Sequence, residues 1–194
     1  MDSLIQAVTI YALPVIFAIT LHEAAHGYVA KHFGDTTAYV LGRVSLNPVR
    51  HIDPVGTIAV PLVLLVLAKL FGGAGILFGW AKPVPVNFGN LRQPKRDMLW
   101  VAAAGPGANL AMALFWALMA KIAVFLPQAA GVPLVLMGQA GVQINLILMV
   151  LNLLPIPPLD GGRIAVSLLP SRAAYRFSML EPYGIMILLA LLLT

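Results

Sequence analysis

The chain opens with eighteen uncharged residues, LIQAVTIYALPVIFAITL (4–21), that run directly into HEAAH at 22–26. A membrane-spanning helix needs about 20 predominantly apolar residues. Ionisable side chains at the end of such a helix are costly to place there and usually serve a function. The opening segment therefore predicts a membrane helix over residues 4–30 that carries a chemical site near one end.

The composition also indicates an integral membrane protein. Of 194 residues, 60% are hydrophobic and 10% are charged, whereas soluble domains carry about 25% charged residues. The net charge of +5 comes from basic residues in short loops without interleaved aromatics, which argues against a nucleic-acid partner. Because the chain has no cysteine, disulfides, iron–sulfur clusters and thiolate zinc sites are excluded. We expect one integral membrane domain over residues 1–194.

Apolar stretches predict an all-α membrane protein, a bundle of about four to five transmembrane helices. The stretches are 4–30, 55–71, 98–126, 132–154 and 177–194. The second is short and contains Pro61 and Lys69. If it crossed fully, the basic loops before and after it would lie on opposite sides, against the rule that positive loops face the cytoplasm. We therefore expect 55–71 to be re-entrant, with a full crossing as the alternative.

This topology predicts a multi-pass protein of the cell membrane with its basic loops, and the site, towards the cytoplasm. The sequence KPVPVNF at 82–88 cannot form a helix, because Pro83 and Pro85 each remove a backbone donor. We expect a short extended or strand-like segment at the membrane surface. It could pair with a substrate peptide by strand addition, or it could be a plain surface loop.

The spacing within HEAAH indicates a metal site. His22 and His26 are four residues apart, so they share one face of a helix and can both reach a zinc ion about 2 Å away. Glu23 is offset by about 100°, which suits contact with a water molecule beside the ion, as in H-E-x-x-H zinc hydrolases. The alternative is that these residues are only interfacial polar groups, but three ionisable groups within five residues favour metal binding.

A catalytic zinc site uses a third protein ligand and keeps one position open. The candidates are His32, His51, Asp35, Asp53, Asp97, Asp160 and Glu181. Asp160 is the best choice, because three prolines break the chain before it and two glycines after it allow close backbone approach. In the four-crossing topology, it also emerges on the same side as the histidines. The alternative for Asp160 is a simple helix N-cap.

Two amides in apolar stretches are further candidates. Asn109, in GPGAN at 105–109, could bond to substrate or to another helix, while the small residues of this motif could serve only close helix packing. Asn152 precedes Asp160 by eight residues and could donate to a developing oxyanion. An interhelical hydrogen bond is the alternative for Asn152.

The motifs HEAAH, GPGAN and NLLPIPPLDGG (152–162) together resemble the site-2 protease family, the intramembrane zinc metalloproteases of peptidase family M50. The stretches LNPVRHIDPVGTI and FGWAKPVPVN look like its compact prokaryotic branch. The resemblance implies one Zn²⁺ per chain, with His22, His26 and Asp160 as ligands, Glu23 as catalytic acid/base and Asn152 assisting at the substrate.

The resemblance further implies hydrolysis of peptide bonds in or near transmembrane segments of membrane protein substrates. Two other interpretations use the same residues: a zinc transporter or metal-sensing membrane protein, and a non-catalytic membrane scaffold. Neither of these interpretations requires Glu23 to act as a base, so the complete His, Glu and Asp set favours the protease.

Overall fold

The fold is built on three long helices. A computed structural model describes residues 2–60, 63, 66–67 and 82–193. Its long helices are α1 (Asp2–His32), α4 (Pro94–Ala123) and α5 (Gln128–Leu153). Each contains a segment long and apolar enough to cross a membrane, and in α1 this segment is Val8–His32. The described part of the chain contains helices and no strand, which confirms the all-α prediction.

Short helical elements connect and follow the long helices. They are α2 (Thr37–Val40), η1 (Pro48–His51), η2 (Pro54–Ala59), η3 (Phe88–Asn90), α6 (Asp160–Leu168), α7 (Ser171–Ser178), η4 (Glu181–Tyr183) and α8 (Gly184–Leu193).

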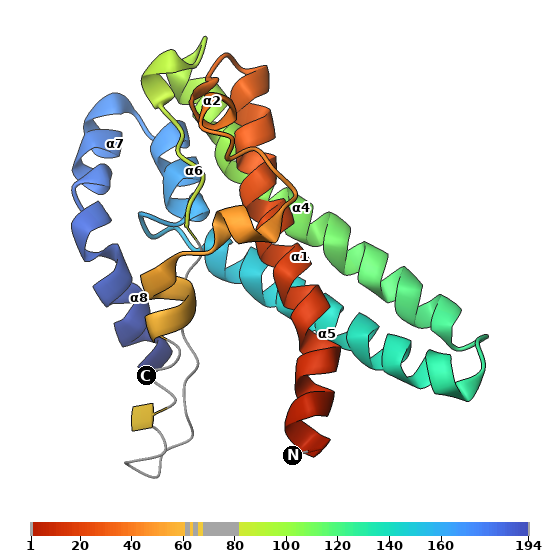
Figure 1. The fold of residues 1–194 in the computed structure, drawn as a ribbon. Helices are drawn as coiled ribbons and strands as arrows, with labels where there is room; N and C mark the ends of the chain where they lie inside the picture. The colour runs from red at the N-terminus through yellow and green to blue at the C-terminus, as the bar shows by residue number, and fades with distance from the viewer. Residues whose placement is uncertain (1, 61–62, 64–65, 68–81, 194) are drawn as a thin grey trace.

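Helices α4 and α5 form an antiparallel hairpin, and α1 crosses it (Figure 1). Small residues let the two helices of the hairpin approach closely. Gly138 faces Ala120, and Gly141 lies against the ring of Trp116, so that a side chain at either glycine would collide with α4. Close approach through small residues is the usual way in which membrane helices associate.

The last three helices gather to one side of α1, away from the loop that joins α4 to α5 (Figure 1). Helix α6 packs against α4 and α5, and α7 packs against α6. Because α6 begins at Asp160, this packing brings the start of α6 to the place where α1 crosses the hairpin.

Three of the predicted crossings correspond to α1, α4 and α5. The fourth predicted crossing, over the apolar stretch 177–194, is divided between the end of α7, η4 and α8. The ten residues of α8 extend about 15 Å at a rise of 1.5 Å per residue, about half the thickness of the hydrocarbon core. Within the described residues, three helices rather than four or five are therefore long enough to cross.

The two unusual segments of the sequence are described only in part. Eight of the 17 residues of the predicted re-entrant stretch 55–71 fall outside the described residues, and residues 55–59 belong to the π-helical turn η2. Residues 82–87 are neither helix nor strand, and η3 follows them. The prolines at 83 and 85 account for the absence of helix there.

Candidate metal centre

Two buried histidines of α1 direct their Nε2 atoms towards the same point. His26 Nδ1 lies 2.7 Å from the carbonyl oxygen of Val101. A carbonyl only accepts, so Nδ1 carries the hydrogen and Nε2 of the neutral imidazole keeps a lone pair. His22 Nδ1 lies 2.6 Å from Oδ1 of Asn109 and donates in the same way. The two Nε2 atoms lie 3.2 Å apart.

Asp160 completes this cluster from α6. Its Oδ2 lies 3.2 Å from His22 Nε2 and 3.3 Å from His26 Nε2. The oxygen is buried and has no hydrogen-bond partner among the described residues. Around a tetrahedral zinc ion with bonds of about 2.0–2.1 Å, neighbouring ligand atoms lie about 3.3 Å apart. The donor set and its spacing therefore fit zinc.

The absence of a side chain at Gly105 keeps this cluster open. Gly105 is a buried residue of α4. A methyl group there would lie 2.7 Å from His22 Nε2 and would also collide with His26 Nε2. The GPGAN motif therefore makes room for the imidazoles at its first residue and binds His22 through Asn109 at its last.

The chain around the proline break explains how Asp160 reaches the histidines. Helix α5 ends at Leu153, and the chain reverses through three prolines before α6 begins. A methyl group on Gly161 would collide with the carbonyl of Leu153, and one on Gly162 would collide with the backbone of Pro157. Glycine at both positions thus lets α6 fold back onto its own connection, with Asp160 at its first turn.

Glu23 lies beside the cluster and contacts a different part of the chain. Its Oε2 accepts a hydrogen bond of 2.7 Å from the backbone N–H of Val84. Val84 belongs to the non-helical segment 82–87, and its neighbours Pro83 and Pro85 have no N–H to offer. The bond fixes one carboxylate oxygen of Glu23 against this segment, 61 residues away in sequence.

The other end of this segment is held by Asp35, which is fully buried. Its carboxylate accepts hydrogen bonds from the backbone and hydroxyl of Thr37, the backbone N–H of Asn87 and the amide of Asn90. Burial alone would raise the pKa of Asp35, but these hydrogen bonds outweigh it and hold that pKa below its usual value. Asp35 therefore ties the end of α1 to residues 87–90.

Other residues considered as the third ligand serve local structure. His51 Nε2 lies 2.8 Å from the carbonyl oxygen of Ser45. Asp53 accepts from the first backbone N–H groups of η2, and Asp97 accepts from Gln93 at the start of α4. The ring of His32 makes an edge-to-face contact with that of Phe33. Glu181 begins η4, and none of these residues joins the cluster of potential ligands.

The two candidate amides occupy different environments. Asn109 is fully buried and contacts both His22 and α5. Asn152 is half-buried, and its amide donates to Leu148 of its own helix at 3.0 Å. Asn145, which the sequence analysis missed, is fully buried and accepts from Asn109 at 3.0 Å. It lies two helical turns before Asn152. Two amides at this helical spacing within an apolar helix are the sequence signal that could have identified Asn145.

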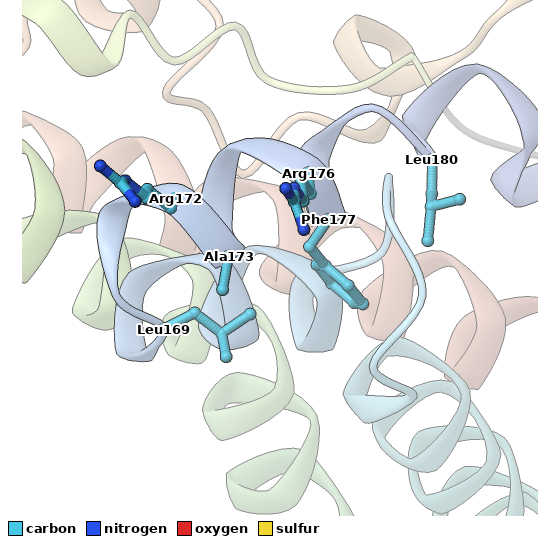
Figure 2. A pocket seen from close by; sticks show the side chains of 6 residues that line it. All are labelled: Leu169, Arg172, Ala173, Arg176, Phe177 and Leu180. Atoms are coloured by element: carbon cyan, nitrogen blue, oxygen red, sulfur yellow. The ribbon is translucent and has the colours of Figure 1, made fainter.

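A separate surface cavity of about 630 Å³ lies against α7. It is lined by Leu169, Arg172, Ala173, Arg176, Phe177 and Leu180 (Figure 2). The two arginines are one turn apart and point to the same side, whereas Leu169 and Phe177 point to another (Figure 2). This division is typical of a helix at a membrane surface. None of the candidate site residues lines the cavity, so it is not the active site.

Comparisons with known proteins identify the family. Residues 127–194 match the model of peptidase family M50. YwhC of Bacillus subtilis (strain 168), which is named provisionally as a zinc metalloprotease, is 38% identical over 190 residues, covering 94% of this chain and 79% of YwhC. The chain belongs to peptidase family M50. It is accordingly an intramembrane zinc metalloprotease, and the transporter and scaffold interpretations are not favoured.

Two further relatives carry the name Rip2, again provisionally as zinc metalloproteases. Rip2 of Mycolicibacterium smegmatis is 29% identical over 179 residues, which cover 92% of this chain and 64% of Rip2. Rip2 of Mycobacterium tuberculosis (strain H37Rv) is 35% identical over 150 residues, covering 75% of this chain and 52% of Rip2. No solved structure gives a significant match.

Replacing Gly105 with alanine is expected to abolish tight zinc binding, because the new methyl group would collide with both candidate ligand nitrogens. Gly107→Ala is the matched control, since a methyl group at 107 meets nothing within 4 Å. Metal content after purification, measured by mass spectrometry, should fall well below that of the parent protein only for Gly105→Ala. Equal zinc content in the two variants would contradict this account of Gly105.

The Asp35→Asn variant is expected to show a pH-dependent loss of stability. The folded-state pKa of Asp35 is depressed, so its contribution is complete above the unfolded-state pKa of about 3.9 and disappears as pH falls through the lower folded-state value. The Tm difference between the parent and Asp35→Asn should therefore be constant from pH 8 to about 5 and shrink below about pH 4. A difference that grows on acidification would refute this role.

Proposed function

We propose that His22, His26 and Asp160 hold one zinc ion per chain, and that Glu23 is the acid/base of peptide hydrolysis. The observation that supports this most strongly is the group of three buried acceptor atoms 3.2–3.3 Å apart. Zinc bound there supplies a Lewis acid that polarises the scissile carbonyl and acidifies a water molecule. Two imidazoles and one carboxylate are also the ligand set of known catalytic zinc sites.

The position of Glu23 supports its role in proton transfer. Its Oε2 is occupied by the N–H of Val84, so Oε1 is the oxygen that takes the proton from the attacking water. The same carboxyl group then delivers a proton to the leaving amine. Because Glu23 directly follows His22 on α1 but points about 100° away from it, it lies beside the metal ligands without competing with them.

We propose that Asn152 stabilises the oxyanion of the tetrahedral intermediate. A donor aimed at developing negative charge contributes most where water is scarce. The amide of Asn152 donates a hydrogen bond to the carbonyl of Leu148. In this role the amide must leave that carbonyl and donate to the substrate instead.

Asn152→Leu should then lower kcat more than it raises KM.

The substrate we propose is a membrane protein cleaved in or near a transmembrane segment. Its scissile peptide must be locally extended, because helical carbonyls are already hydrogen-bonded. The segment 82–87 is non-helical and touches Glu23 through Val84, which supports pairing of the substrate with this segment by strand addition.

We further propose a single membrane domain, a bundle of about four to five transmembrane helices, together with a re-entrant stretch at 55–71 that does not cross. The active site and the basic loops face the cytoplasm. The three apolar helices α1, α4 and α5 supply most of the crossings. Arg172 and Arg176 of α7 follow Asp160 with no predicted crossing between them, so in this topology they lie on the same side as Asp160, as the positive-inside rule requires.

Glu23→Gln is expected to retain zinc but to lose at least about 100-fold in the cleavage rate, the usual contribution of a general base. His22→Ala should lose both zinc and cleavage. The assay uses purified protein in liposomes with a single-span substrate, together with metal analysis of the same samples. Cleavage by Glu23→Gln at the parent rate would exclude Glu23 as the acid/base.

Because the chain has no cysteine of its own, single introduced cysteines can test how the protein is oriented in the membrane. Gln128 and Ser171 are exposed residues at the starts of α5 and α7. In intact cells, a membrane-impermeant maleimide should label Gln128→Cys, and Ser171→Cys should be labelled only after permeabilisation. The reverse pattern would place the basic loops and the active site outside the cell.

A further inference from the structure

A chain of three buried side chains leads from His22 to the backbone of α5. His22 Nδ1 donates to Oδ1 of Asn109 at 2.6 Å, and Asn109 Nδ2 donates to Oδ1 of Asn145 at 3.0 Å. Asn145 Nδ2 donates to the carbonyl of Gly141 at 2.8 Å. Asn109 and Asn145 are both 0% exposed. This series of hydrogen bonds therefore runs from α1 through α4 to α5, and its two asparagines are shielded from solvent.

The donor and the acceptor of each hydrogen bond in this series are fixed, starting from the carbonyl of Gly141 in α5. The carbonyl of Gly141 only accepts, so it orients the amide of Asn145 with Nδ2 towards it and Oδ1 towards α4. Asn109 must then present Nδ2 to Asn145 and Oδ1 to His22. The carbonyl of Ala18, 3.3 Å from Asn109 Nδ2, favours the same orientation.

The direction matters because it decides which nitrogen of His22 is free. If the amide of Asn109 were flipped, its NH₂ group would face Nδ1, and the hydrogen of the imidazole would move to Nε2. Nε2 would then have no lone pair for a metal. His26 does not depend on such a chain, because its Nδ1 donates directly to the main-chain carbonyl of Val101, which cannot flip.

We propose that Asn145 is a positioning residue for the metal centre. It acts through Asn109 to hold the His22 imidazole in the Nδ1–H form, with Nε2 directed at the ion. Partners of this kind around a zinc-bound histidine typically change metal affinity by 10- to 100-fold. The inference rests on the proposed role of His22 as a ligand and assigns a function to a residue of α5 that does not touch the ion.

The test measures zinc affinity by competition with a chelator, in detergent, for Asn145→Leu and Asn145→Ala. Both variants remove the amide, but leucine fills the space and alanine leaves a cavity. We expect the same 10- to 100-fold loss of affinity in both, although their Tm values should differ. Unchanged affinity in both variants, or a loss that follows Tm, would overturn the proposal.

Gly138→Ala is the control for the packing of α4 against α5. A methyl group there would lie 2.6 Å from Cβ of Ala120, so it disturbs the same interface without touching the amides. Its Tm should fall and its zinc affinity should stay at the parent value. An equal loss of affinity in Gly138→Ala would show that packing, rather than the amide of Asn145, controls the site.

A double-variant comparison tests whether Asn145 acts through Asn109. If it does, Asn109→Leu combined with Asn145→Leu should bind zinc no more weakly than Asn109→Leu alone, because interacting residues are not additive. Additive losses of zinc affinity would show that Asn145 does not act through Asn109. A parent protein without zinc, or a His22→Ala variant with parent affinity, would instead refute the proposed metal site itself.

Discussion

Two imidazole nitrogens and one carboxylate oxygen face one another at 3.2–3.3 Å, with both imidazole hydrogens directed elsewhere. Three acceptors gathered away from water repel one another unless a cation lies between them. The features around them serve this requirement. Val101 and Asn109 orient the rings, Gly105 leaves space, and the proline break presents Asp160. Three motifs far apart in the sequence, HEAAH, GPGAN and NLLPIPPLDGG, therefore meet at one site that favours a bound cation.

Two carboxylates, Glu23 and Asp35, organise the segment beside this cluster. Glu23 accepts from the N–H of Val84, and Asp35 accepts from that of Asn87. The prolines at 83 and 85 remove two of the remaining donors in the segment, so little of its polar backbone is left for a helix or a sheet. This arrangement couples the position of the proposed acid/base to the segment proposed to receive the substrate.

Local sequence patterns predicted the parts of the structure that depend on local physics. Apolar runs predicted α1, α4 and α5, and the four-residue spacing placed His22 and His26 on one face. Other features depend on tertiary contacts. The bond from Val84 to Glu23 joins residues 61 apart, and that from Asn109 to Asn145 joins residues 36 apart, which no local pattern specifies. The run 177–194 divides where Gly184 packs against Pro157, a contact that hydropathy does not reveal.

The most direct measurement is X-ray absorption spectroscopy at the zinc edge on the purified protein. The account predicts about one zinc per chain, surrounded by nitrogen and oxygen atoms at about 2.0–2.2 Å, with the multiple-scattering pattern of two imidazoles. Asp160→Asn should alter that spectrum or remove the metal. Protein without zinc, or zinc whose spectrum lacks imidazole scattering, would contradict the claim that His22, His26 and Asp160 hold the ion together.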